Sequence, residues 1–513
     1  MKKEGIPPLS TTPLLIPAVS VVLGILTAPE VNVGWPLLVV FGISVVLTWI
    51  LYRRSIAQSI GLFLCFFLLG MLAGQRGTHS GKQGISDDSV VEAVVFSEPA
   101  EKPKTMAVDL LVTASHTGLT KHTESRLLRC YLWKDNRSRT LRLGQGVVVR
   151  NASKGFVRSS DWYVGGQAQR QMSRMQRVRL RFLMLRVQLL GRYRTPMGKP
   201  LDTDGTTGKP SDTDGTTGKP SDTDGTTGKP LDTDMTQDEA YAVLAAMTLG
   251  DKSALTKELR ETYSVTGASH ILALSGLHLG IIYLLLSRLT LRRRRFWLSQ
   301  AVVILSIWAF VFLTGLSTSI IRSATMISIY ALFSVAGRHR SPVNLLCFTA
   351  IIMLLVSPDA LYDIGFQLSF SAVLAILLLM PLFERLFPDN YFVSHPWKRM
   401  IYNLVGVSVA AQIGVAPLIA YHFGRFSTYF LLTNFIVIPA ATFILYGALL
   451  VLLFPSLAGV LLEVVRVLNK ALGMVSQMPC ASIDGLHPSV LQVLCLYVFF
   501  LCLYLAARKI LNY

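Results

Sequence analysis

Several polar side chains lie inside a hydrophobic segment that runs from Gly267 to about Leu289. His270, Ser275 and His278 are polar or ionisable, and groups of this kind are costly in hydrocarbon unless they face a protein interior or a water-filled path. Glycines in the same stretch weaken a helix locally. We therefore expect these three side chains to line a broken or closely packed helix near the outer end of a pathway.

The same residues could carry other chemistry. Ser275 and His278 lie three apart on one helical face, so a nucleophile and a base could meet, which makes a membrane-embedded hydrolase the alternative function. A third, orienting group is missing nearby, and Gly-x-Ser-x-Gly is absent. His270 and His278 diverge by about 80° around a helix of 3.6 residues per turn, and no Asp or Glu accompanies them. No Walker A sequence occurs either, so we do not expect the chain to hydrolyse nucleotide by that route. With none of these patterns complete, we expect no metal, no cofactor and no enzymatic activity.

The least lipid-like of the later apolar segments contains an arginine, Arg322. Placing Arg at the bilayer centre costs about 2.5–3.5 kcal/mol on insertion scales, so this side chain should face an anion, a carboxylate or water. The alternative is a structural ion pair with Asp359, Asp363 or Glu463. Together with Arg322, polar side chains in other apolar runs predict a bundle around a hydrated interior: Gln367, Gln412 and Asn434.

Residues 76–169 differ from the apolar segments, because apolar and polar residues alternate there, as at Val108, Leu110 and Val112. This alternation predicts four or five β-strands, which suit a small barrel such as an OB-fold. Basic and aromatic residues are interleaved on it, and cationic grooves with aromatic platforms suit single-stranded nucleic acid. In the alternative, the aromatic side chains fill the barrel core. The candidate binding residues are Arg126, Arg129, Tyr131, Trp133, Arg137, Arg139 and Arg142.

The composition predicts a polytopic α-helical membrane protein with one extracytoplasmic OB-like β-barrel insert. Of the 513 residues, 51% are hydrophobic and 15% are charged, against about 25% charged in soluble domains. The apolar runs predict about ten transmembrane helices. Arg53, Arg54 and the run Arg292 to Arg295 mark cytoplasmic loops, which puts the N-terminus in the cytoplasm and the β insert outside. Part of the net charge of +19 follows from that rule, and part is consistent with an anionic partner.

The chain divides into five parts. Transmembrane helices at 1–75 precede the OB-like domain at 76–169, and 170–194 is an arginine-rich amphipathic helix expected on the surface of the lipid bilayer. Residues 195–237 carry a ten-residue repeat with almost no apolar side chains, which predicts a disordered linker. Residues 238–513 form a second transmembrane domain.

Four stretches resemble the ComEC family, the inner-membrane channels of bacterial competence. The likeness spans about 240 to 450, and it implies passage of single-stranded DNA into the cytoplasm during natural transformation, across the bacterial cytoplasmic membrane. It also implies a DNA receptor outside and a helicase inside as partners, and a homo-oligomer is a further expectation. The stretches are Leu249-Gly-Asp-Lys with Gly267 to Gly280, Thr314 to Arg338, Gly365-Phe-Gln-Leu-Ser-Phe, and Ala411-Gln-Ile-Gly-Val-Ala-Pro-Leu through Asn434 and Pro439.

The chain also departs from that family. Many relatives end in a metallo-β-lactamase-like domain, whereas this chain stops just after its last apolar run and shows no His-x-His-x-Asp-His cluster. We therefore expect no nuclease of its own. By the resemblance, 238–513 is the channel domain, and its translocation path would include His270, Ser275, His278, Arg322, Gln367, Gln412 and Asn434.

Overall fold

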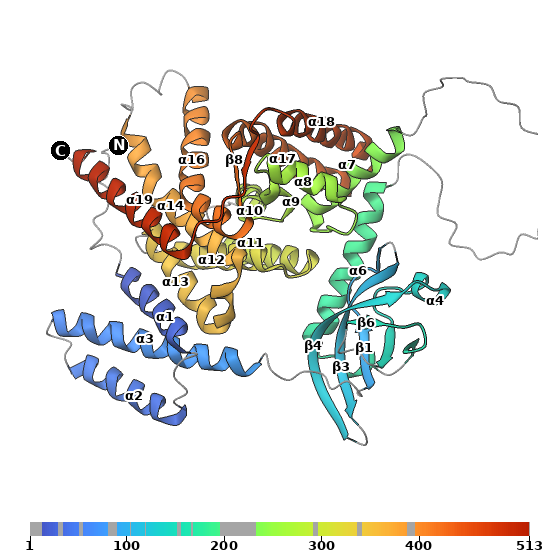
Figure 1. Cartoon of the computed structure of the whole chain (residues 1–513), viewed down its shortest axis with the longest axis horizontal. Coiled ribbons are helices and arrows are strands. Elements are labelled where there is room, and N and C mark those ends of the chain that lie inside the picture. The colour runs from blue at the N-terminus through green and yellow to red at the C-terminus, as the bar shows by residue number, and fades with distance from the viewer. Residues whose placement is uncertain are drawn as a thin grey trace, which may run out of the picture.

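The computed structural model describes residues 13–28, 34–50, 55–80, 90–102, 104–117, 120–150, 155–165, 168–194, 232–290, 296–335, 341–386 and 396–511. Helices form a large bundle with an N-terminal group packed against it, and a seven-stranded β-sheet lies beside the bundle (Figure 1). Most of the predicted repeat linker, at 195–231, lies outside the described residues, as do the arginines at 53–54 and 292–295.

Three helices come first: α1 (Leu15–Thr27), α2 (Gly34–Ile50) and α3 (Ser55–Ser80). The backbones of α1 and α3 approach so closely that a Cβ on Gly24 would clash with the carbonyl of Phe67. Small residues allow this kind of contact between membrane helices. The backbone N–H of Leu14 donates to Asn344 Oδ1 at 3.3 Å, and this bond helps to dock α1 against α13 (Pro342–Val356).

Residues 90–164 form one sheet of seven strands rather than the predicted four or five. Its order is β6-β4-β3-β1-β5-β7, with β2 paired to β3, and the short β6 and β7 end it at opposite edges. Strands of two or three residues are too short to show alternation, which is why β2, β6 and β7 were not predicted. The described sheet is therefore a half-barrel. The strands are β1 (Val90–Val95), β2 (Ala100–Glu101), β3 (Thr105–Thr117), β4 (Thr120–Trp133), β5 (Gly146–Arg150), β6 (Phe156–Val157) and β7 (Trp162–Val164).

The sheet buries its two faces differently. The concave face holds a core that includes Cys130 and Trp162. Part of the other face is covered by α5 (Ala168–Gln171) and α6 (Arg174–Arg194), whose Leu180 and Leu183 pack with apolar side chains of β1 and β3. The predicted arginine-rich segment is thus helical, and α6 runs from the sheet to the helical bundle (Figure 1). Its contact with a bilayer surface stays a prediction.

The rest of the chain is the helical bundle. Helix α7 begins at Asp232, inside the segment predicted as a linker, and its residues 240–249 are almost all buried between α6, α17 and α18. The elements are α7 (Asp232–Leu249), α8 (Lys257–Val265), α9 (Ser269–Leu272), α10 (Gly276–Thr290), α11 (Phe296–Leu313), α12 (Thr318–Val335), α13, α14 (Ile364–Leu386), α16 (Pro396–Phe423), β8 (Arg425–Ser427), α17 (Phe430–Leu453), α18 (Ala458–Ser476), β9 (Ser482–Asp484) and α19 (Val490–Leu511).

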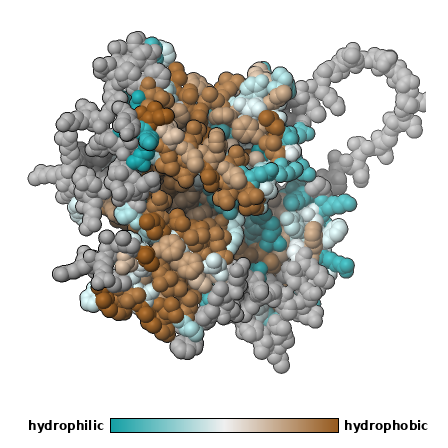
Figure 2. Space-filling view, turned by 60° about the vertical axis from the view of Figure 1, so that its left-hand side comes forward, coloured by the Kyte–Doolittle hydropathy of each residue, from teal (hydrophilic) through white to brown (hydrophobic). Residues whose placement is uncertain are grey.

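Five of the described helices are long and apolar enough to cross a membrane: Ala57–Gln75, Ile364–Leu386, Trp397–Phe423, Phe430–Leu453 and Val490–Leu511. Other apolar helices, such as α1 and α13, have 13 and 15 residues, and about 20 residues usually span the hydrocarbon. Hydrophobic side chains form a broad central area on the face that Figure 2 shows, and hydrophilic ones gather on its right-hand side. The chain is a helical membrane protein, and the count of about ten spans stays a prediction.

Candidate functional site

The hydrophobic segment with two histidines is broken, as the sequence predicts. Helix α9 ends at Leu272 and α10 begins at Gly276, so Ser275 stands directly before a helix start. The backbone N–H of Ser275 donates to His278 Nδ1 at 3.2 Å, and Ser275 Oγ lies 3.0 Å from the same nitrogen. His278 thus reaches back to the residue before the helix, as the third residue of a capping box does.

This geometry fixes the proton on His278. A backbone N–H can only donate, so Nδ1 is the acceptor, and the neutral ring carries its proton on Nε2. His278 is 1% exposed, and its Nε2 has no hydrogen-bond partner in the part of the chain that the structure describes. Buried donors without an acceptor are rare, and a water or ligand oxygen usually completes them.

Arg322 lies in the first turns of α12 and is also buried, at 3% exposure. Its Nη1 is 3.5 Å from Asp363 Oδ1, so the ion pair with Asp363 that the sequence left as an alternative is present. The pair is loose, because well-formed charged hydrogen bonds measure about 2.7–2.9 Å. The Arg322 Nε, moreover, has no partner among the described residues.

Asp363 has a second role, at the start of α14. Its Oδ1 accepts the backbone N–H of Phe366 at 2.7 Å, which caps the helix. A Cβ on Gly365 would lie 3.0 Å from that oxygen and 3.3 Å from Arg322 Nη2. A residue larger than glycine would therefore crowd the guanidinium and its partner.

Contacts link these groups across four helices. A Cβ on Gly276 would lie 2.8 Å from Ser323 Oγ, so the start of α10 lies against α12 beside Arg322. Gln367, one turn beyond Asp363, contacts His422 Nε2 through its Oε1 at 3.0 Å and donates from its Nε2 to a backbone carbonyl. The ends of α10, α12, α14 and α16 thus meet in one polar layer, formed by Ser275, His278, Arg322, Ser323, Asp363, Gln367 and His422.

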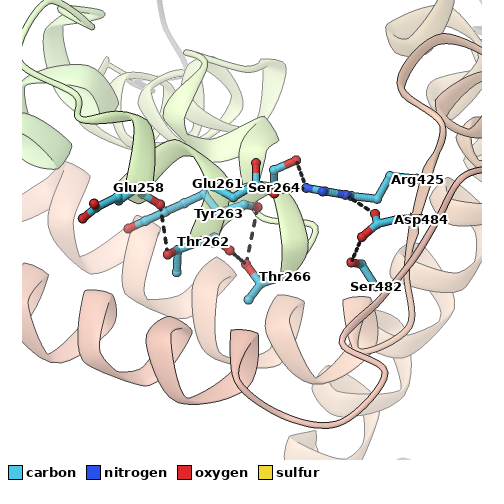
Figure 3. Close-up of polar contacts among 9 residues, drawn as sticks. All are labelled: Glu258, Glu261, Thr262, Tyr263, Ser264, Thr266, Arg425, Ser482 and Asp484. Atoms are coloured by element: carbon cyan, nitrogen blue, oxygen red, sulfur yellow. Dashed lines mark hydrogen bonds and ion pairs between the residues drawn. The ribbon is translucent and has the colours of Figure 1, made fainter.

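A charged cluster lies just beyond the end of α16, around Arg425 (Figure 3). Arg425 begins β8, which pairs with β9. Its guanidinium contacts Glu261 at 2.7 Å, Ser264 Oγ at 3.2 Å and the Asp484 carboxylate. The cluster therefore holds the β8–β9 ribbon against α8. It could not be predicted from local sequence, because Asp484 lies far along the chain from Arg425 and Glu261.

Three of the predicted path residues lie outside the polar layer. His270 is exposed, and its Nδ1 lies 3.1 Å from the carbonyl of Gly267. Gln412 lies ten residues before His422 on α16, which places it about 15 Å along the helix axis. Asn434 lies in the second turn of α17, and among the described residues no hydrogen bond joins it to the polar layer.

The outer face of the sheet carries exposed aromatic side chains. On β4 the inward residues are Cys130 and Leu132, so Tyr131 and Trp133 point to the other face. Tyr131 stacks on Phe156 with ring centroids 5.0 Å apart, and Trp133 and Phe156 are 49% and 62% exposed. These three residues form the aromatic platform. Phe156 was not predicted, because the pairing of β4 with β6 cannot be inferred from a two-residue strand.

One cation lies over the aromatic platform, and further basic side chains lie on and after β4. Lys102 Nζ lies 4.6 Å from the centre of the Tyr131 ring. Arg129 forms two hydrogen bonds with Asp109, at 2.7 and 3.0 Å, and this carboxylate raises the pKa of Arg129. Trp162, by contrast, is 1% exposed and fills the core. The exposed arginines on and after β4 are Arg126, Arg129, Arg137 and Arg139 on the short α4 (Asn136–Arg139), and Arg142.

Comparison with known proteins places the bundle in one family. The family model described as "Competence protein" matches residues 247–509. The chain is 30% identical over 225 residues to ComE operon protein 3 of Bacillus subtilis, covering 43% of this chain and 27% of that protein. No solved structure matches the chain.

Two further relatives match comparable stretches. An uncharacterized protein of Aquifex aeolicus is 32% identical over 180 residues, 35% of this chain and 40% of its own length. Recombination protein 2 of Haemophilus influenzae is 25% identical over 232 residues, 42% of this chain and 28% of its own. The chain thus matches between 27% and 40% of the length of these curated relatives.

The two roles of Asp363 can be separated by substitution. Asp363→Asn keeps a capping side chain but removes the charge that faces Arg322, whereas Asp363→Ala removes both. We expect both variants to be less stable than the parent. The Ala variant should lose about 1 kcal/mol more of the free energy of unfolding than the Asn variant, because it also loses the helix cap. Thermal unfolding of the detergent-solubilised protein measures this. The control is Asp359→Asn at a nearby exposed carboxylate; stabilities equal to that control would contradict the ion pair.

Proposed function

The chain belongs to the competence protein family, and on that premise we propose that it is an inner-membrane channel that passes single-stranded DNA into the cytoplasm during natural transformation. The observation that carries the proposal is the polar layer inside an apolar bundle. Two of its members, His278 and Arg322, are buried donors with atoms that lack a partner among the described residues. Phosphate oxygens are acceptors that could complete them.

A passing polyanion needs contacts that are weak and repeated, so that the strand enters favourably and can still leave. The loose Arg322–Asp363 pair suits this requirement, because a phosphate can exchange with the carboxylate at a small net cost. The half-buried Gln367 would supply a further neutral contact. In this proposal Gln412 and Asn434 line the path at other depths.

The proposed topology has about ten transmembrane helices, a cytoplasmic N-terminus and the OB-like half-barrel outside. The aromatic platform would stack bases of an incoming strand, and the neighbouring arginines would contact its phosphates. The chain itself would act as a channel rather than an enzyme. The driving force would come from a cytoplasmic helicase, the strand from an external DNA receptor, and the channel could assemble as a homo-oligomer.

A membrane-embedded hydrolase is the second candidate, and the 3.0 Å contact between Ser275 Oγ and His278 favours it. A hydrolytic triad would need a group that orients the histidine. The Nε2 of His278 has no such partner in the described part of the chain, and the contact has the geometry of a helix cap. These features support the channel over the hydrolase.

The aromatic platform gives the first test. We expect Tyr131→Ala and Phe156→Ala in the full-length, detergent-solubilised protein to weaken binding of an oligo(dT) probe by about 1–3 kcal/mol each, the range for loss of one base–aromatic stack. Fluorescence anisotropy at several salt concentrations measures the affinity, which should fall as salt rises. Tyr163→Ala is the matched control, because Tyr163 is 51% exposed on β7, at the opposite edge of the sheet. An equal loss in all three variants would argue against the platform.

Deleting the gene tests the function as a whole. Without a channel the strand cannot cross, so transformation frequency should fall to the background of the assay while DNA still binds to the cell surface. Both quantities can be counted in the same culture, with labelled DNA and a selectable marker. An unchanged transformation frequency would end the proposal.

Ser275→Ala separates the channel from the hydrolase. In a hydrolase the change removes the nucleophile, and nearly all activity is lost. In a channel it removes one hydroxyl contact with His278, with a cost of about 0.5–1.5 kcal/mol for the lost hydrogen bond. We expect transformation to stay within an order of magnitude of the parent; loss as complete as that of the deletion strain, with normal amounts of protein in the membrane, would favour the hydrolase.

A further inference from the structure

The stretch Leu249-Gly-Asp-Lys has no place in the site described so far, yet its aspartate meets the arginine-rich helix. Arg186 Nη2 on α6 lies 3.4 Å from Asp251 Oδ1, and both side chains are only 17% exposed. Burial lowers the pKa of Arg186, and the Asp251 carboxylate opposes that shift. The Glu98 carboxylate opposes the shift as well, and Asp251 is the carboxylate that forms an ion pair with this largely buried cation.

Two left-handed turns lie beside this pair. Gly250 has φ +74°, and a Cβ there would lie 2.6 Å from Leu274 Cδ1 and 3.4 Å from the carbonyl of Thr314. Gly315 and Leu316 follow with φ +88° and +62°. A positive φ is strained for leucine, so surrounding contacts must hold this turn.

Helix α6 supplies some of those contacts. A Cβ on Gly315 would lie 3.4 Å from Arg186 Nη1, and Arg179 donates to the Gly315 carbonyl at 3.4 Å. The Arg179 guanidinium also lies 5.0 Å from the centre of the Phe96 ring, at the end of β1 in the sheet domain. One face of α6 thus touches the β domain and both turns.

Each turn leads directly into the polar layer. Leu274, which packs on Gly250, precedes Ser275, and Leu316 stands two residues before α12, which carries Arg322. Leu274 and Leu316 also belong to the same apolar cluster. A shift of α6 against the two turns would therefore move the starts of α10 and α12.

We propose that Arg186 and Asp251 are positioning residues, whose ion pair seats α6 and the attached β domain against the two turns and so aligns the aromatic platform with the polar layer. This inference rests on the proposed function. It assigns the pair no contact with DNA. Its loss should impair passage of the strand more than binding of the strand.

The test uses the full chain and compares two readouts. Arg186→Ala should lower DNA uptake about tenfold, while the affinity of the detergent-solubilised protein for an oligo(dT) probe changes by no more than about twofold. Asp251→Asn, which keeps the shape and removes the charge, should act in the same way. Arg186→Lys keeps the charge and should recover most of the uptake. Arg181→Ala removes an exposed arginine from the same helix and serves as the control.

Protein amounts in the membrane are measured for every variant. Normal uptake in both Arg186→Ala and Asp251→Asn would overturn the inference, and so would a parallel loss of uptake and oligonucleotide affinity, which would assign the pair to folding of the β domain. If the Arg186→Ala protein fails to accumulate in the membrane, the uptake of the Asp251→Asn and Arg186→Lys variants decides whether the inference holds. Failure of the proposed function is a separate result, because uptake would then persist in the deletion strain.

Discussion

The constraint on which this structure depends is the cost of holding a guanidinium inside an apolar bundle. Arg322 is 3% exposed on α12, which packs among apolar helices. A buried charge of this kind requires a partner. That partner is Asp363, which stands at the end of an element rather than within one. The bundle therefore places helix ends, with their polar backbone groups, at the depth of the arginine.

The same requirement explains the neighbouring features. A helix start exposes backbone N–H groups that need acceptors, and His278 and Asp363 supply them for α10 and α14. Glycines at 276 and 365 let these starts approach the side chains of α12. Helix breaks, glycines and the buried cation are thus parts of one arrangement, since irregular backbone at membrane depth persists only where protein or water satisfies it.

Local chemistry could be predicted from the sequence, and distant pairing could not. The cost of polar groups in apolar runs was enough to predict a broken or closely packed helix around His278 and a shielded Arg322, with Asp363 among three possible partners in the alternative of a structural ion pair. The stack of Tyr131 on Phe156 depends on parallel pairing of two strands, one of which has two residues. The Arg425 cluster likewise joins residues that meet only in the folded bundle. Gln412 and Asn434 were selected because they are polar residues in apolar runs. That property does not tell how far along its helix a residue lies from the polar layer.

The ion pair is looser than structural stability alone would favour. A tightly paired, fully buried arginine and aspartate would be costly to separate, since removing one partner leaves an unpaired buried charge. Here the distance is 3.5 Å, the Asp363 side chain is 39% exposed, and its hydrogen bond with the backbone N–H of Phe366 holds the carboxylate at the start of α14 independently of Arg322. An anion that approaches from the exposed side of Asp363 can thus compete for Arg322 while α14 keeps its cap. In the proposed channel, which would bind and release successive phosphates, a loose pair of this kind is more useful than a stronger one.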